Sequence, residues 1–239
     1  MTKSQYADRW RWQSGMARSL RFPFGGAETL TNNCSQAWQD IFVLSMLEGK
    51  REGRYLEIGG QVPIENNNTH VLQQSFGWTG VTVELNPGHF PEWQRLRPKS
   101  VFVIADALTL DYRQAIPKWF GSERGHVDYL QLDIDPSVNT LAVLKQLPLD
   151  AYRFSVITFE TDAYAGDRRA RDESRELLGR HGYELVAQDV CVVFSPVSSS
   201  PIPFEDWWVD PAIVASAKID ALKARATDPL LPQDLLFSS

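Results

Sequence analysis

Short apolar runs alternate with helix-like segments along the middle of the chain, between residues 54 and 160. This alternation predicts a parallel β-sheet whose strands are joined by crossover helices. The expected strands are Arg54–Ile58, Val81–Glu84, Val101–Ile104, Val127–Leu132 and Phe154–Phe159. The expected helices are Thr69–Phe76, His89–Leu96, Tyr112–Phe120 and Val138–Leu147. Pro117 predicts a break in the third helix, because an interior proline removes a backbone hydrogen bond.

The pattern changes after the fifth strand. A charged segment, Asp167–Arg180, is expected as an exposed helix. The next two strand-like runs, Tyr183–Ala187 and Cys191–Phe194, lie too close together for a crossover helix, so we expect an antiparallel hairpin. Ser35 is expected to be the N-cap of a helix that precedes the first strand. The predicted fold class is therefore α/β, a Rossmann-like sheet that is mostly parallel, with a C-terminal antiparallel β-hairpin and helices on both faces.

Both ends of the chain differ from this middle part. Residues 1–34 are expected as an arm in which arginines interleave with aromatic residues, and packing on the same or a neighbouring subunit is favoured over an anionic membrane surface. The main domain is expected at residues 35–211, followed by a C-terminal helix, Pro211–Ala226, and tail within residues 212–239. A Ser/Pro-rich loop precedes Trp207 and Trp208, which are expected to line the acceptor side of the site, because loops at strand ends often carry specificity.

Composition narrows the class of protein. The 239 residues carry a formal net charge of −6, which argues against nucleic acid as the main partner, because phosphate backbones are bound through basic stripes. The only cysteines, Cys34 and Cys191, are far apart and fit neither a zinc-binding motif nor a disulfide framework. No segment has the pattern of a signal peptide or of a membrane span. A cytoplasmic protein is expected, and a homo-oligomer is left open.

The carboxyl ends of the expected parallel strands are acidic. Ligands of open α/β sheets bind at this edge, so the candidate chemistry lies there. Glu84 is placed to accept both hydroxyls of an adenosine ribose, and Asp106 to reach the adenine edge. Gly59 and Gly60 follow the first strand and would allow a ligand to approach the backbone. The acidic strand-end residues are Glu57, Glu84, Asp106, Asp133, Asp135, Glu160 and Asp162; each alone has the ordinary alternative of a turn or helix cap.

The segment after the first strand, GGQVPIENNNT, lacks the GxGxxG pattern with which a helix N-terminus holds a dinucleotide pyrophosphate. A carboxylate-rich pocket suits a sulfonium cation better. Several sequence motifs together resemble those of the FkbM-type methyltransferases, a class I S-adenosylmethionine-dependent family. These motifs are SQAWQD, YLEIGG, NNNTHVLQQSFGWTGVTVELNP, LDID, ITFETD, HGYELV and FEDWWV.

This resemblance covers about three quarters of the chain. It implies O-methylation of a hydroxyl on a sugar or natural product, with a small-molecule or glycan acceptor. The cofactor implied is S-adenosylmethionine, and the implied cofactor-binding residues are Gln36, Glu57, Gly59, Asn68, Glu84 and Asp106, to which the backbone argument adds Gly60.

A hydroxyl acceptor must lose a proton, and either a general base or a divalent cation can assist this. Asp133 and Glu160, at the ends of neighbouring strands, are the candidate catalytic residues. Together with Asp135 and Asp162 they form an oxygen-only set of candidate ligands for Mg²⁺. Two other functions are left open: a metal-dependent nucleotide-sugar glycosyltransferase, because Asp133-Ile134-Asp135 has DxD spacing, and a binding module without catalysis.

Overall fold

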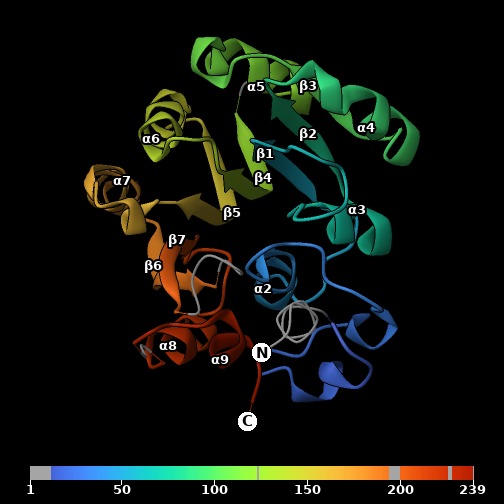
Figure 1. The fold of residues 1–239 in the computed structure, drawn as a ribbon, viewed down its shortest axis with the longest axis vertical. Coiled ribbons are helices and arrows are strands. Elements are labelled where there is room, and N and C mark those ends of the chain that lie inside the picture. The colour runs from blue at the N-terminus through green and yellow to red at the C-terminus, as the bar shows by residue number, and fades with distance from the viewer. Residues whose placement is uncertain (1–11, 123, 194–199, 226–227, 239) are drawn as a thin grey trace.

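The computed structural model describes residues 12–122, 124–193, 200–225 and 228–238. Its centre is a seven-stranded sheet in the order β3-β2-β1-β4-β5-β7-β6, shown in Figure 1. The first five strands are parallel to one another, and β7 is antiparallel to both of its neighbours. The strands are β1 (Arg54–Ile58), β2 (Thr79–Glu84), β3 (Val101–Ile104), β4 (Gly125–Leu132), β5 (Tyr152–Glu160), β6 (Glu184–Val192) and β7 (Ile202–Val209). The predicted fold class is confirmed.

The predicted partner strands of the hairpin are wrong. The two short runs at residues 183–194 form one strand, β6, and its antiparallel partner is β7, which was expected to begin as a loop. The ladder between them is irregular from Leu185 to Cys191, where Asp189 adopts a positive φ of 53°. A local irregularity in one strand therefore looks like a turn in the sequence. Phe194 lies outside the described residues.

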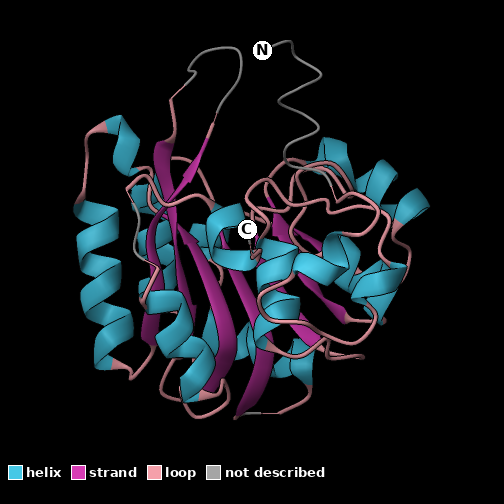
Figure 2. Ribbon diagram, turned by 90° about the horizontal axis from the view of Figure 1, so that it is seen from below, coloured by secondary structure: helices cyan, strands magenta, loops and turns pink. Residues whose placement is uncertain are grey.

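Helices cover both faces of the sheet (Figures 1 and 2). In Figure 1, α6 and α7 lie on one side, while α2, α3 and the C-terminal helices lie on the other. The helices are α2 (Gln39–Met46), α3 (His70–Phe76), α4 (Phe90–Leu96), α5 (Tyr112–Phe120), α6 (Ser137–Gln146), α7 (Arg169–Arg180), α8 (Ser216–Lys223) and α9 (Pro232–Leu236). Short 3-10 turns span Met16–Ser19, Ala27–Thr29, Pro87–His89, Ala107–Thr109 and Ala163–Ala165.

Three expectations about helices are wrong in detail. Helix α5 runs through Pro117 without a break, because Asp111 caps its start and buried Tyr112 and Ile116 anchor it. Ser35 is not the N-cap of α2: the helix begins at Gln39, and the Ser35 hydroxyl instead donates to the buried Asp40 carboxylate. The last expected helix is shorter than predicted, Ser216–Lys223, and α9 follows it as a separate helix.

The sheet separates two apolar cores. Trp207 packs in the core that contains α2, where its ring stacks on Phe42 at a centroid distance of 4.3 Å, whereas Trp208 packs in the core on the opposite face. Because both rings are buried, the expectation that they line an acceptor site is wrong. Successive residues of a strand point to opposite faces, so two adjacent tryptophans in β7 serve two cores.

The N-terminal segment packs on this same chain. Trp12, Phe22 and Phe24 are buried in the core that contains α2. The Arg21 side chain donates to the backbone carbonyl oxygens of Leu235 and Phe237, at 3.1 and 2.7 Å, so the two ends of the described chain are fastened together. Residues 1–11 lie outside the described part. Within that part, no helix has both the length and the apolar character needed to cross a membrane.

Candidate active site

The carboxyl ends of β1 to β4 enclose a cavity of about 240 Å³. Five residues predicted from the sequence lie together in its wall: Gly59, Glu84, Asp106, Asp133 and Asp135. The other lining residues are Gln61, Val83, Leu85, Ala105, Ala107, Leu108, Ile134 and Asn139. The cavity thus has three kinds of surface: carboxylates, apolar side chains and the backbone of the β1 loop.

The two glycines after β1 are required by close packing. Gly59 has a φ of +87°, and a Cβ atom there would lie 1.7 Å from the carbonyl oxygen of Asp133. A Cβ atom on Gly60 would lie 2.1 Å from the Cγ2 atom of Thr82. Gly59 lines the cavity, whereas Gly60 is buried behind it. The freedom of glycine therefore allows protein backbone and side chain, rather than a ligand alone, to approach the β1 loop.

Glu84 ends β2 with its carboxylate held in a fixed position. One oxygen accepts from the backbone N–H of Gln61 at 2.9 Å, and the other accepts from that of Asn86 at 2.8 Å. A carboxylate has about four acceptor sites, so each oxygen can accept one more hydrogen bond. Asp106 is exposed at the end of β3, and its side chain caps the following turn by accepting from Leu108 N–H at 2.9 Å.

Glu57 and Asn68 lie outside this cavity. The Glu57 carboxylate is buried and accepts from the hydroxyls of Thr69, at 3.1 Å, and Thr82, at 2.7 Å. Burial raises the pKa of Glu57, and the nearby Arg97 opposes that rise. Asn68 is also buried, and its Oδ1 atom has no hydrogen-bond partner among the described residues. Glu57 thus anchors the start of α3 to the sheet.

Arg97 is a functional candidate that the sequence interpretation missed. It is buried, and its guanidinium donates to Asn67 Oδ1 at 2.7 Å, to Thr69 Oγ1 at 2.9 Å and to the Tyr55 hydroxyl at 3.0 Å. The same group lies 4.3 Å from the centre of the Trp93 ring. These contacts fix the loop between β1 and α3, which forms part of the site. In the sequence, Arg97 simply follows a predicted helix, and this position does not indicate that it fixes the loop.

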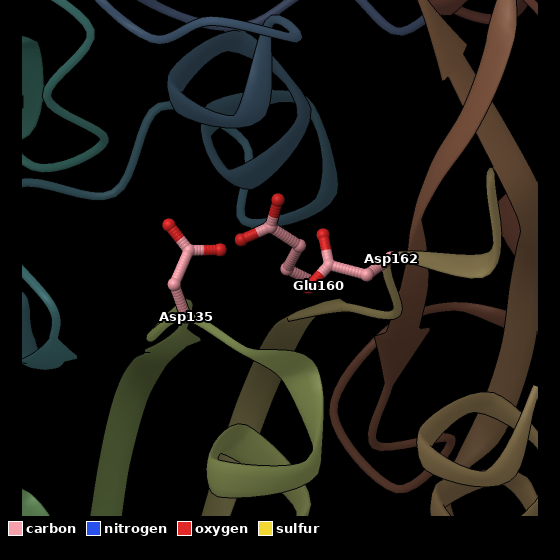
Figure 3. Close-up of side chains that lie close together, drawn as sticks. All are labelled: Asp135, Glu160 and Asp162. Carbon is pink, nitrogen blue, oxygen red and sulfur yellow. The ribbon is translucent and has the colours of Figure 1, made fainter. Parts of the chain in front are cut away.

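Asp135, Glu160 and Asp162 bring carboxylate oxygens within 4.8 Å of one another. Figure 3 shows the three side chains converging from the ends of β4 and β5. Asp133, the fourth predicted metal ligand, shares a hydrogen bond with Glu160. Burial, followed by that hydrogen bond and the neighbouring carboxylates, raises the pKa of Glu160 far above its usual range. Burial also raises the pKa of Asp133, and the other charges acting on it are carboxylates. We refer to these four residues as the carboxylate cluster.

Glu205 adds a fifth acid that the sequence interpretation did not single out. It lies directly opposite Glu160 in the antiparallel pairing of β5 and β7. Its Oε1 atom accepts from Trp207 Nε1 at 2.5 Å, and its side chain is also hydrogen-bonded to Gln39. Burial raises the pKa of Glu205 to about 8. The available signal of a strand was the residue types Phe204, Trp207, Trp208 and Val209, which are enriched in strands.

This raised pKa predicts how stability depends on pH. Between the usual glutamate range and about 8, the folded protein keeps the Glu205 proton that the unfolded chain releases. The free energy of unfolding should therefore fall as pH rises through that window. Glu205→Gln keeps the hydrogen-bonding capacity without the titration, so the variant should be more stable than the parent at about pH 8 and similar to it at about pH 4. Urea unfolding at both pH values, with EDTA to keep cations off, measures this. If the free energies of unfolding of Glu205→Gln and the parent differ by the same amount at both pH values, the prediction is wrong. Glu92→Gln, at an exposed position, is the matched control.

Gln36 lines a second cavity of about 500 Å³ rather than the first. This cavity lies between the segment before α2, the loop after β1 and the end of β6. Its lining residues are Asn32, Asn33, Cys34, Ser35, Gln36, Ile64, Glu65, Asn66, Val192 and Val193. The structure therefore separates Gln36 from the other predicted cofactor-binding residues.

No protein-family model matches the chain, and no curated protein matches it. Solved structures do match. An O-methyltransferase from Bacillus cereus in complex with SAH is 19% identical, with a TM-score of 0.50 over 77% of this chain and 85% of that one. The cofactor-bound protein Rv0187 from MTB is 18% identical, with a TM-score of 0.50 over 82% and 85% of the two chains.

The chain has the class I methyltransferase fold. The strand order with an antiparallel β7 and the likeness to these structures support this statement together. At such low identity the likeness establishes the fold and does not identify an acceptor. Membership of the FkbM-type family stays a prediction, as do the roles of the individual site residues.

Proposed function

We propose that the protein is an S-adenosylmethionine-dependent methyltransferase that acts on a hydroxyl oxygen of a small-molecule or glycan acceptor. One observation carries this proposal: on a class I methyltransferase fold, the carboxyl ends of the strands enclose a cavity that brings Gly59, Glu84 and Asp106 together. Ligands of open α/β sheets bind at this edge, where the order of the strands reverses.

The side chains around the cavity fit S-adenosylmethionine. Glu84 has unused acceptor capacity for the two ribose hydroxyls, and apolar Leu85 and Leu108 offer surfaces for the adenine ring. The described residues that line the cavity include carboxylates and no lysine, arginine or histidine, which favours a sulfonium cation over a diphosphate. When bound, S-adenosylmethionine supplies an electrophilic methyl group. Gly59, Glu84 and Asp106 would hold it, whereas Glu57 would act from behind by bonding Thr69 at the start of α3.

The carboxylate cluster is proposed to receive the proton of the acceptor. In the transfer, a lone pair of the hydroxyl oxygen forms the new C–O bond, the C–S bond breaks and leaves its electrons on sulfur, and the hydroxyl proton leaves. Asp133 and Glu160 share one proton through their hydrogen bond, so one member of the pair can accept another. Such general-base assistance contributes about 10²- to 10⁴-fold to a rate.

Asp135, Glu160 and Asp162, with Asp133 beside them, are also proposed to hold Mg²⁺. Their oxygens are hard ligands of the kind that this cation prefers. An ion bound there would lower the pKa of an acceptor hydroxyl. The DxD reading of Asp133 and Asp135 as a nucleotide-sugar site is less well supported, because the adjoining cavity offers no basic side chain to a diphosphate.

The first test of the proposed function is cofactor binding by Glu84→Ala. Removing a carboxylate that accepts from both ribose hydroxyls should weaken binding of S-adenosylmethionine by about 30- to 150-fold. Isothermal titration calorimetry measures this change, and titration with a UDP-sugar tests the glycosyltransferase alternative in the same samples.

Two further variants make the result interpretable. Glu84→Gln retains an acceptor for the backbone of the β1 loop, so it should show an intermediate loss if the ribose contact matters. Glu92→Ala changes an exposed glutamate on α4 and should bind as the parent does. If Glu84→Ala folds and binds S-adenosylmethionine like the parent, the assignment of Glu84 fails. If the parent binds a UDP-sugar and not S-adenosylmethionine, the proposed function fails.

A further inference from the structure

The larger of the two cavities described above, about 500 Å³, lies at the same edge of the sheet as the proposed cofactor cavity. This volume falls within the range of about 300–1,000 Å³ that is usual for small-molecule sites. Ile64, Glu65 and Asn66 in its wall belong to the loop that begins at Gly59 in the other cavity. The two cavities therefore adjoin opposite ends of one loop.

The carboxylate cluster is connected to both cavities. On one side, Asp133 and Asp135 line the proposed cofactor cavity. On the other side, the backbone N–H of Thr161, between Glu160 and Asp162, donates to the Phe204 carbonyl at 2.9 Å. Phe204 packs with Ala37 and Val192. Val192 lines the larger cavity, and so does Gln36, which precedes Ala37 in the chain. The wall of the larger cavity is thus connected through Phe204 to the end of β5, which carries part of the cluster.

The wall that contains Gln36 is built in place by buried hydrogen bonds. The Asp40 carboxylate accepts from the backbone N–H groups of Cys34, at 2.7 Å, and Ser35, at 3.2 Å. Gln39 Oε1 accepts from Ala37 N–H at 2.7 Å, and the Gln39 side chain is bonded to Glu205 of β7. These contacts fix the segment from Cys34 to Ala37 without using the Gln36 side chain.

The side chains in this wall define the kind of ligand. Carboxamides of Asn32, Asn33, Gln36 and Asn66 supply both donors and acceptors, and Glu65 supplies an acceptor. The described residues that line it include no lysine, arginine or histidine, so among them a phosphate or carboxylate would find no cation. Among the described residues, the Gln36 side chain has no hydrogen-bond partner of its own, which leaves its amide available to a ligand.

We propose that the larger cavity binds the methyl acceptor, that Gln36 is a specificity-determining residue there, and that the acceptor is an uncharged molecule bearing several hydroxyl or amide groups. This inference rests on the proposed function. It moves Gln36 from the cofactor, where the sequence interpretation placed it, to the acceptor. It predicts acceptors without phosphate or carboxylate groups near the methylated hydroxyl.

The charge of the acceptor is tested with tritium-labelled S-adenosylmethionine and a small-molecule extract of the source cells. After reaction, the labelled products are passed over an anion-exchange column. We expect the label to emerge in the unretained, uncharged fraction. Label that is retained as anionic product would overturn the proposal, and so would the absence of labelled product when calorimetry shows that S-adenosylmethionine binds. Absence of that binding would instead overturn the proposed function.

The role of Gln36 is tested with the purified labelled acceptor fraction as the probe. Gln36→Ala should raise the apparent KM for this fraction about 5- to 10-fold, the usual effect of losing a hydrogen bond, and leave the affinity for S-adenosylmethionine unchanged. Gln74→Ala, at an exposed position of α3, is the matched control and should change neither value. A Gln36→Ala variant that binds S-adenosylmethionine more weakly, or that keeps the parental KM, would overturn the assignment.

Discussion

Replacing Arg175 with methionine is expected to lower the free energy of unfolding by about 3 kcal/mol near neutral pH. The Arg175 guanidinium bonds both oxygens of the Asp206 carboxylate at 2.8 Å, and the Asp206 side chain is fully buried. Removing the cation leaves a buried carboxylate whose only remaining described partner is the backbone N–H of Asp189, at 2.8 Å. Urea unfolding measures the loss.

Two variants separate the ion pair from other effects. Arg175→Met combined with Asp206→Asn removes the unpaired charge, so most of the lost stability should return. Arg180→Met changes an exposed arginine on the same helix and should have little effect. Burial already raises the pKa of Asp206 and Arg175 opposes this rise, so without Arg175 the loss of stability should shrink as pH falls. A loss that is equal in the single and double variants would contradict the explanation.

The same pair helps to place the site. Asp206 faces α7 while its neighbour Glu205 faces Gln39 of α2, so two successive residues of β7 link helices on opposite faces of the sheet. Because Glu205 lies opposite Glu160, these links position β7 beside the carboxylate cluster. We therefore expect Arg175→Met to weaken the order of the site as well as the fold.

The parallel strands could be predicted because each reads as a short run rich in apolar residues, and all but the edge strand β3 are largely buried. The two last strands of the sheet, β6 and β7, could not be predicted correctly. Gln188 and Asp189 interrupt β6 like a turn, yet the strand continues as an irregular ladder against β7. The acids of β7 were not singled out from the sequence, because the partners that satisfy them, Arg175 and Gln39, come from distant parts of the chain.

The candidate site also contains residues that could be predicted from the sequence and residues that could not. Glu84, Asp106 and Asp133 come together because each lies at or just after the carboxyl end of a parallel strand, and these ends share one edge of the sheet. Gln36 and Arg97 lie outside the strand ends, and their places depend on how α2 and the residue after α4 pack on the sheet. No local pattern gives that packing, so the separation of Gln36 from Glu84 and Asp106 was not predicted and Arg97 was missed.

Removing divalent cations is expected to reduce methyl transfer by at least about 100-fold while leaving the affinity for S-adenosylmethionine unchanged. The proposed ligands Asp135, Glu160 and Asp162 lie together at the ends of β4 and β5, apart from the ribose contact proposed for Glu84. Activity is assayed in EDTA and again after Mg²⁺ is restored, and calorimetry measures cofactor binding in each condition.

Glu160→Gln distinguishes the cation from a general base. Neighbouring carboxylates and burial favour the protonated form of Glu160, so protons compete with a cation for this cluster, and Mg²⁺ affinity should fall as pH falls. Electron paramagnetic resonance of added Mn²⁺ measures that affinity without an activity assay. Glu160→Gln should weaken Mn²⁺ binding and lose activity, whereas Glu92→Gln should do neither. Full activity in EDTA, together with a Glu160→Gln variant that is still inactive, would reject the cation and leave Glu160 paired with Asp133 as the base. Full activity of Glu160→Gln would reject both roles, because then neither the proton nor the cation depends on this carboxylate.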